Sequence, residues 1–303
     1  MEPLDFRFVF AEDFYELYCM SHLTFTIIQT NLHWEDKAAN LQMLEQKINS
    51  IQHPTQIIVL PEMFNTGFSM NPASLAEEMN GPTVEWMKRI ATEKKVILTG
   101  SIMIKETGES QAAQSGQTNF YNRLIWMLPN GQYGVYDKRH RFAYAGEDNH
   151  FSAGTKRLIA SVNGWKINLQ VCYDLRFPVW ARQQAPTSPP TPLQKRGEEE
   201  LEYDVLIYVA NWPERRIHAW KTLLTARAIE NQCYVIGVNR TGDDGNNIHY
   251  TGNSMVIDGM GEVLYEKTND EDIHTITLSK EKLQDIRTKL PFLKDADDFS
   301  ILL

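Results

Sequence analysis

Short apolar runs of strand length recur along the chain, and several end abruptly in polar residues. The runs rich in β-branched residues lie at 24–29, 56–62, 95–104, 165–172, 203–212 and 233–240. Two of the intervals between them, 36–52 and 214–232, carry apolar residues at helical spacing. Strands that alternate with amphipathic helices favour an α/β fold in which crossover helices join parallel strands.

Two other segments predict hairpins. Residues 120–138 hold two alternating runs around the turn residues Pro129, Asn130 and Gly131, and residues 253–267 repeat the pattern around Asp258 and Gly259. The chain is therefore expected to combine βα units with hairpins.

The domain organisation follows from length and composition. A chain of 303 residues that is 42% hydrophobic suits one large core. We expect one domain over residues 20–303, preceded by a dispensable extension at 1–19. The proline-rich, charged stretch at about 184–202 is expected to be a disordered surface insertion, because strand-like sequence resumes on both sides.

Charge and hydropathy exclude several classes of protein. The formal net charge is −9, but acidic stretches at 1–19 and 183–203 carry much of it, and no Lys/Arg-rich stretch suggests nucleic-acid binding. We expect neither a signal peptide nor a membrane span, because no window of about 18 residues is continuously apolar. The three scattered cysteines, Cys19, Cys172 and Cys233, fit a reducing cytoplasm.

Three reactive side chains stand where predicted strands end. Glu62 closes the run IIVLPE, Lys138 closes the second strand of the first predicted hairpin, and Cys172 follows INLQV. Each alone has an ordinary explanation: an exposed acid, a solvated cation, a small core residue. Strand ends that converge on one edge of a sheet are, however, where α/β proteins build sites. A thiol nucleophile needs a base and donors for an oxyanion, for which Glu62, Lys138 and the backbone N–H of Tyr173 are candidates.

Two other readings of the same residues stay open. Cys172 or Cys233 could pair with His150 or His218 in a Cys–His enzyme, or the chain could be an inactive scaffold that serves as a binding module. A metal site is not expected, because the histidines form no HxxxH or HxxEH pair.

The stretches LPEMFNTGF, YDKRHRF and VCYDLRFPVWAR, in that order, resemble the three motif regions of the nitrilase (carbon-nitrogen hydrolase) superfamily. The resemblance extends from about Thr24 to near the C-terminus and includes YVANWPERRIHAWKTLLTARAIENQ. It implies that Glu62, Lys138 and Cys172 are catalytic and that Glu147 is the second glutamate that supports the lysine. It also implies a four-layer αββα sandwich, a homodimer and no cofactor.

Within the superfamily the motifs look most like the omega-amidase branch. That resemblance implies hydrolysis of the terminal amide of 2-oxoglutaramate and 2-oxosuccinamate through a cysteine thioester. An aliphatic amidase, an N-carbamoyl hydrolase or a nitrilase would use the same three residues, so these activities stay open.

The residues around the nucleophile give three further expectations. Asp174 and Arg176 are expected to form a buried ion pair that fixes the loop after Cys172. Lys138 is expected to favour the thiolate. Phe64, Arg176 and Trp212 are candidates for the substrate pocket. The cations that could bind a substrate carboxylate are Arg139, Arg141, Arg176 and Arg215.

Overall fold

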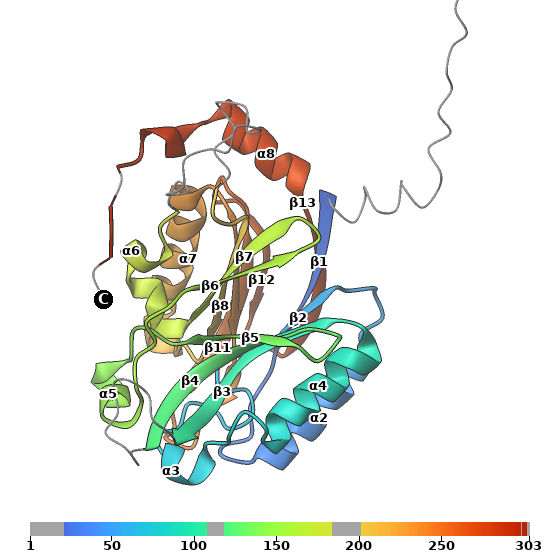
Figure 1. Cartoon of the computed structure of the whole chain (residues 1–303), viewed down its shortest axis with the longest axis vertical. Coiled ribbons are helices and arrows are strands. Elements are labelled where there is room, and N and C mark those ends of the chain that lie inside the picture. Colours follow the sequence, from blue (N-terminus) through green and yellow to red (C-terminus); the bar gives the residue numbers. More distant parts are fainter. Residues whose placement is uncertain (1–20, 108–117, 184–200, 298, 302–303) are drawn as a thin grey trace, which may run out of the picture.

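The computed structural model describes residues 21–107, 118–183, 201–297 and 299–301. The predicted extension at 1–19 and most of the predicted insertion lie outside these residues. The described chain builds two mixed β-sheets (Figure 1). The first has the order β13 (Asp272–Ser279), β1 (His22–Gln29), β2 (Ile57–Val59), β3 (Ile97–Thr107), β4 (Thr118–Met127) and β5 (Tyr133–Asp137).

The second sheet repeats the arrangement with a later part of the chain. Its order is β10 (Thr241–Asp243), β11 (His249–Ile257), β9 (Tyr234–Asn239), β8 (Val205–Ala210), β7 (Trp165–Val171) and β6 (Leu158–Val162), and β12 (Val263–Thr268) pairs with β11. Strands β1, β2 and β3 are parallel, as are β7, β8 and β9. The two predicted hairpins are confirmed as the antiparallel pairs β4–β5 and β11–β12.

Helices cover the outer face of each sheet (Figure 1). The α-helices are α2 (Lys37–Asn49), α3 (Pro72–Leu75), α4 (Pro82–Lys94), α5 (Glu147–His150), α6 (Pro178–Ala181), α7 (Ile217–Asn231) and α8 (Lys280–Lys289). The 3-10 helices are η1 (Ala143–Ala145), η2 (Cys172–Arg176), η3 (Glu214–Arg216) and η4 (Phe292–Asp295). Helices α2 and α4 lie outside the first sheet, and α6 and α7 lie outside the second.

The inner faces of the sheets pack on each other. One apolar cluster includes Phe25 and Val59 of the first sheet together with Leu169 and Val209 of the second. A second cluster joins the first sheet to the apolar faces of α2 and α4. The predicted four-layer αββα sandwich is confirmed.

Local signals explain where the principal helices begin and end. The Asp36 carboxylate accepts a hydrogen bond from the N–H of Ala39 and so caps α2. Pro82 stands in the first turn of α4, where its missing N–H costs nothing, and Lys95 ends that helix in the left-handed conformation. No helix among the described residues is long and apolar enough to cross a membrane.

Candidate active site

Four polar side chains stand just beyond four strand ends. Glu62 follows β2, Lys138 follows β5, Cys172 follows β7 and Asn211 follows β8. Strands β2 and β5 belong to the first sheet, whereas β7 and β8 belong to the second. The site therefore lies where the two sheets meet, at the carboxyl ends of strands, as in open α/β sheets generally.

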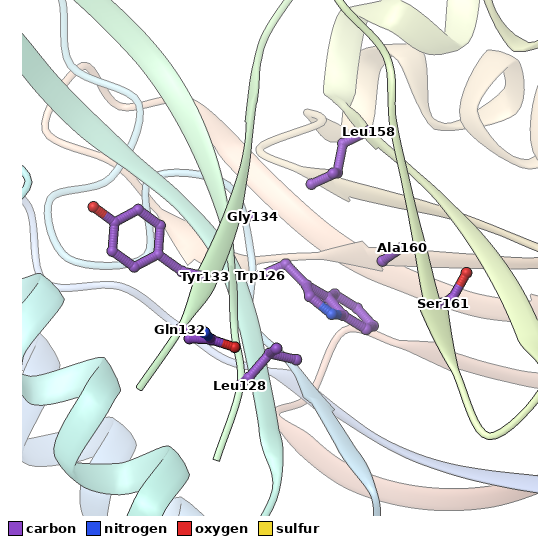
Figure 2. Close-up of a pocket in the computed structure, with 8 residues that line it drawn as sticks. All are labelled: Trp126, Leu128, Gln132, Tyr133, Gly134, Leu158, Ala160 and Ser161. Atoms are coloured by element: carbon purple, nitrogen blue, oxygen red, sulfur yellow. The ribbon is translucent and has the colours of Figure 1, made fainter. Parts of the chain in front are cut away.

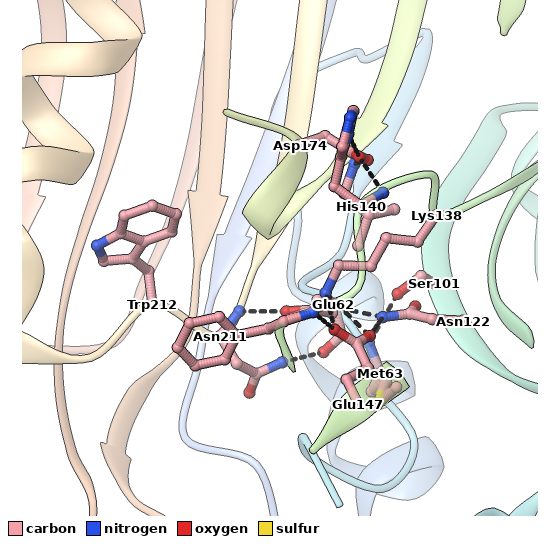
Figure 3. A network of polar contacts seen from close by, with 12 residues as sticks. Glu62, Met63, Ser101, Asn122, Lys138, His140, Glu147, Asp174, Asn211 and Trp212 are labelled. Carbon is pink, nitrogen blue, oxygen red and sulfur yellow. Dashed lines mark hydrogen bonds and ion pairs between the residues drawn. The ribbon is translucent and has the colours of Figure 1, made fainter. Parts of the chain in front are cut away.

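Lys138 lies between two buried carboxylates (Figure 3). Its Nζ donates to Glu62 Oε1 at 2.9 Å and to Glu147 Oε1 and Oε2 at 3.0 and 2.8 Å. The side chain of Lys138 is 1% exposed and those of both glutamates are 0% exposed. Nζ also lies 5.2 Å from the centre of the Phe68 ring. The predicted Glu62–Lys138–Glu147 grouping is thus present as one hydrogen-bonded unit.

The charges of this unit are set by opposing effects. Burial lowers the pKa of Lys138, but Glu147 and Glu62 outweigh it, and the net direction is a raised pKa. The ammonium therefore stays protonated. Burial raises the pKa of Glu147, as does Glu62, while Lys138 opposes them. The net direction is a raised pKa for Glu147, because it is buried in a unit that places one ammonium between two carboxylates.

Two asparagines that sequence reasoning missed hold the carboxylates. Asn122 Nδ2 donates to Glu62 Oε1 at 2.8 Å and to Glu147 Oε1 at 3.3 Å. The N–H of Asn211 donates to Glu62 Oε2 at 2.8 Å, and its Nδ2 donates to the backbone carbonyl of Glu62 at 2.6 Å. Asn211 directly follows a strand, so the reasoning applied to Cys172 could have found it. Asn122 lies inside β4, where a buried amide is the only signal.

Cys172 is the first residue of η2 and has a strained backbone. Its φ is 44°, in the left-handed region that non-glycine residues rarely adopt, at a cost of about 1–3 kcal/mol. The side chain is 8% exposed. Strain of this kind, at a thiol directly after a strand, is typical of functional sites.

Lys138 favours the thiolate of Cys172, as expected, but other effects on the pKa of this thiol are larger. Burial raises the pKa of Cys172, Glu62 and Glu147 act in the same direction, and Lys138 opposes them without prevailing. The resting thiol is therefore neutral. A group that takes its proton must act during the attack on a substrate, and Glu62, which interacts with this thiol, is the neighbouring carboxylate.

The predicted ion pair between Asp174 and Arg176 is wrong. The buried Asp174 carboxylate accepts from the N–H of Val171 at 3.1 Å, from Tyr136 Oη at 2.8 Å, and from His140 N and Nδ1 at 2.9 and 2.8 Å. The exposed Arg176 lies over the Trp212 ring, 5.0 Å from its centre. Asp174 points into the protein while Arg176, two positions later on the short η2, points outward.

Asp174 therefore joins the two strands that carry Lys138 and Cys172. Tyr136 and His140 stand two residues before and after Lys138, and Val171 directly precedes Cys172. Figure 3 shows His140 and Asp174 beside the carboxylate cluster. The His140 ring also stacks on Phe177, with centroids 3.8 Å apart. Sequence reasoning did not identify His140, because only the fold brings it to Asp174.

The other predicted site residues have different surroundings. Tyr173 is the second residue of η2. Its ring packs against the rings of Phe142 and Phe177, with centroid distances of 4.9 and 5.2 Å. Trp212 is almost fully buried next to Asn211. Phe64 lies in the apolar cluster between the first sheet and α4, against Trp86 at 6.0 Å, so it is a core residue.

In the part of the chain that the structure describes, no hydrogen bond joins the residues of the alternative Cys–His site. His150 and His218 are exposed, and neither forms a hydrogen bond to Cys172 or Cys233. Cys233 is fully buried, and burial raises its pKa. In the described part of the chain, no group of three or more His, Cys, Asp or Glu side chains is arranged to hold a metal ion.

A shallow hollow lies elsewhere, between β4, β5 and β6 (Figure 2). Its lining is Trp126, Leu128, Gln132, Tyr133, Gly134, Leu158, Ala160 and Ser161. None of the candidate site residues belongs to this lining, and the lining holds no nucleophile paired with a base. The chemistry therefore belongs to the buried cluster at the meeting of the two sheets.

Comparisons with known proteins agree with this geometry. The family model described as "Carbon-nitrogen hydrolase" matches residues 24–288. The chain is 39% identical to an omega-amidase YafV of Yersinia enterocolitica, over 93% of this chain and all of that protein. It is 30% identical to a 2-oxoglutaramate amidase of Bacillus subtilis, over 90% of this chain and 96% of that one.

A solved structure has the same architecture. The crystal structure of XC1258 from Xanthomonas campestris, described as a CN-hydrolase superfamily protein with an arsenic adduct in the active site, matches with a TM-score of 0.83. The two chains are 38% identical, and the match covers 92% of this chain and 99% of that one.

Proposed function

The chain belongs to the carbon-nitrogen hydrolase family, and on that premise we propose that it is an omega-amidase. It hydrolyses the terminal amide of 2-oxoglutaramate and 2-oxosuccinamate to the 2-oxo acid and ammonia. The near full-length similarity to omega-amidases and to a 2-oxoglutaramate amidase supports the substrate class. The observation that carries the chemistry is the buried Lys138, bonded to both Glu62 and Glu147 beside a strained thiol.

In the first half-reaction, Glu62 takes the proton of the neutral Cys172 thiol as Sγ adds to the amide carbon. The carbonyl oxygen becomes an oxyanion, which accepts hydrogen bonds from Lys138 Nζ and from the N–H of Tyr173. A donor of this kind contributes about 3 kcal/mol to lowering the barrier. The C–N bond then breaks, Glu62 returns its proton to the departing nitrogen, and ammonia and a thioester result.

In the second half-reaction, Glu62 deprotonates a water molecule that attacks the thioester carbon. The new oxyanion uses the same donors, the C–S bond breaks, and the thiolate recovers the proton from Glu62. Glu147 keeps Lys138 charged and in place throughout, while Asn122 and Asn211 hold Glu62. One carboxylate thus serves both half-reactions.

We also propose a domain organisation, an oligomeric state and a cellular compartment for the enzyme. A single domain over residues 20–303, present as a homodimer in the cytoplasm, agrees with the family resemblance. Both described cysteines are free thiols, which suits a reducing compartment. The proposed chemistry uses side chains and a backbone N–H of this chain, together with water.

The test is release of ammonia from 2-oxoglutaramate by the purified protein, with Cys172→Ala measured in parallel. Fast release by the wild type and none by the variant would support both the substrate and the nucleophile. Release only from another amide or from an N-carbamoyl compound would move the protein to a different branch of the family. Activity that survives in Cys172→Ala would refute the mechanism.

A further inference from the structure

The substrate class raises a question that the catalytic residues do not answer. A 2-oxo dicarboxylate monoamide keeps a carboxylate at the end opposite its amide, and a buried carboxylate needs a cation or hydrogen-bond donors. This inference rests on the proposed function, because it concerns how that substrate is recognised. The structure distinguishes among the arginines near the site.

Two of the four arginines considered from the sequence have structural partners. Arg139 donates from Nη1 to the carbonyl of Gly154 at 3.1 Å, and Arg141 donates from Nη1 to the carbonyl of Phe151 at 3.0 Å. Of the other two, Arg215 is exposed on η3, and Arg176 is exposed over the Trp212 ring. None of these four is a partly buried guanidinium left without an acceptor.

Arg216, the next residue on η3, has the required position. Its guanidinium lies 4.9 Å from the centre of the Phe142 ring. The N–H of Phe142 donates to Glu147 Oε2, and the Phe142 ring contacts that of Tyr173, the residue after the nucleophile. The backbone of Arg216 is fixed as well, because its carbonyl accepts from Trp212 Nε1 at 2.8 Å. Phe142 thus lies between Arg216 and two parts of the catalytic cluster, which are Glu147 and the Tyr173 that follows Cys172.

The electrostatic surroundings of Arg216 lack an anion. Among the described residues, its half-buried guanidinium forms no hydrogen bond and no ion pair. Burial lowers the pKa of Arg216, and the neighbouring Arg215 and Arg176 act in the same direction. The groups that raise the pKa of Arg216 are the Cys172 thiol and the Tyr250 phenol, and neither is a carboxylate. A guanidinium that has lost part of its hydration without gaining an anion is suited to bind one.

We propose that Arg216 binds the free carboxylate of the substrate and makes the enzyme selective for amides that carry one. The planar guanidinium can donate two parallel hydrogen bonds to a carboxylate. Such binding also fixes the distance between the carboxylate and the amide that reaches Cys172.

The first experiment compares Arg216→Met with Arg215→Met on a charged and a neutral amide. For Arg216→Met we expect kcat/KM for 2-oxoglutaramate to fall by about 10- to 100-fold, mainly through KM, the range typical of a hydrogen bond to a charged group. Its kcat/KM for pentanamide, which has no carboxylate, should stay within about twofold. Arg215→Met should stay within about threefold on both amides, because only a screened surface charge is lost.

A binding measurement makes the test independent of turnover. In Cys172→Ala, adding Arg216→Met should weaken calorimetric binding of 2-oxoglutaramate by about tenfold or more. Equal losses on both amides, or unchanged binding of 2-oxoglutaramate, would overturn the role of Arg216 while leaving the omega-amidase activity standing. A wild-type enzyme that cleaves pentanamide but not 2-oxoglutaramate would instead refute the proposed function, and this inference with it.

Discussion

At the residue scale, the chemistry depends on where protons lie in a cluster with little access to water. Lys138 is protonated because the two glutamates outweigh the effect of burial on its pKa, and the resting Cys172 thiol is neutral because burial and the same glutamates raise its pKa. Only a carboxylate beside the thiol can take its proton as attack proceeds, which makes Glu62 the residue whose loss should be most informative.

Replacing Glu62 with Gln should lower kcat by about 10²- to 10⁴-fold, the usual contribution of a positioned acid or base. The substituted glutamine keeps the shape of the side chain but cannot take a proton, and its amide group would face the donors of Lys138 and Asn122. The measurement is steady-state ammonia release, with circular dichroism as the check on folding. A folded Glu62→Gln enzyme that keeps a tenth of the wild-type kcat or more would favour the Cys–His alternative.

Asp174 and Arg176 should behave differently despite standing two positions apart. Asp174→Asn should lower the free energy of unfolding by about 1–3 kcal/mol, because the new amide cannot accept from all four donors that the carboxylate satisfies. Arg176→Met should change it by less than about 0.5 kcal/mol, as expected of an exposed side chain. Urea unfolding measures both. Equal losses in the free energy of unfolding of the two variants would instead support the ion pair between Asp174 and Arg176 that the sequence suggested.

At the element scale, the end of β5 is fixed by a close backbone crossing. The N–H of Gly154 donates to the carbonyl of Lys138 at 3.0 Å. A Cβ added at Gly154 would lie 2.0 Å from the carbonyl oxygen of Asp137, closer than any real contact. The absence of a side chain at Gly154 therefore lets the loop approach the strand end that presents Lys138.

Gly154→Ala should destabilise the protein by about 1–3 kcal/mol, as overpacking of a tight contact does. It should also lower kcat, because moving the strand end displaces Lys138, and small displacements of catalytic groups are costly. Gly134→Ala, in β5 itself, is the control, since the Cβ added at Gly134 would meet only the Leu158 side chain at 3.3 Å. Thermal unfolding and ammonia release report both effects. If the two variants showed similar stability and similar kcat, the close approach of Gly154 to β5 would not be what positions Lys138.

The elements themselves were largely predictable, but their long-range pairing was not. Apolar runs predicted β1, β2, β3, β7, β8 and β9, and turn residues predicted both hairpins, because these signals are local. The pairing of β13 with β1 joins His22 to Ser279, and no local pattern specifies a partner so distant in sequence.

The site was predictable to a similar degree. Strand ends and family motifs identified Glu62, Lys138, Glu147 and Cys172, which the structure brings into one cluster. Asn122 reaches Glu62 through the strand order of the first sheet, and Asn211 reaches it through the packing of the two sheets, so both were missed. The predicted partner of Asp174, Arg176, was also wrong, because only the fold brings His140 to Asp174.

At the scale of the whole molecule, the site depends on both sheets at once. Glu62 from the first sheet accepts from Asn211 of the second, and Lys138 and Cys172 are likewise contributed by different sheets. A loss of packing between the sheets therefore separates the base from the nucleophile. Global stability and activity should fall together, and alkaline pH provides a way to test this.

Buried tyrosines and thiols should make the protein lose stability as pH rises. Burial raises the pKa of Tyr136, Tyr203, Tyr208, Cys172 and Cys233. In the unfolded chain these groups release protons near their ordinary values, about 8.5 for Cys and about 10 for Tyr. Above those values the unfolded state binds fewer protons than the folded state, so the free energy of unfolding falls with pH.

Urea unfolding between pH 8 and 10.5, under reducing conditions, should show this decline, which is absent below about pH 8 because both states then hold these protons. Each group adds a slope of up to about 1.4 kcal/mol per pH unit above its unfolded pKa. Tyr208→Phe keeps the buried ring and should make the slope shallower by up to one proton. Tyr144→Phe, at a side chain that is 80% exposed, should leave it unchanged. Stability that stays constant up to pH 10.5 would contradict the burial of these groups, and with it the closed packing that joins Glu62 to Cys172.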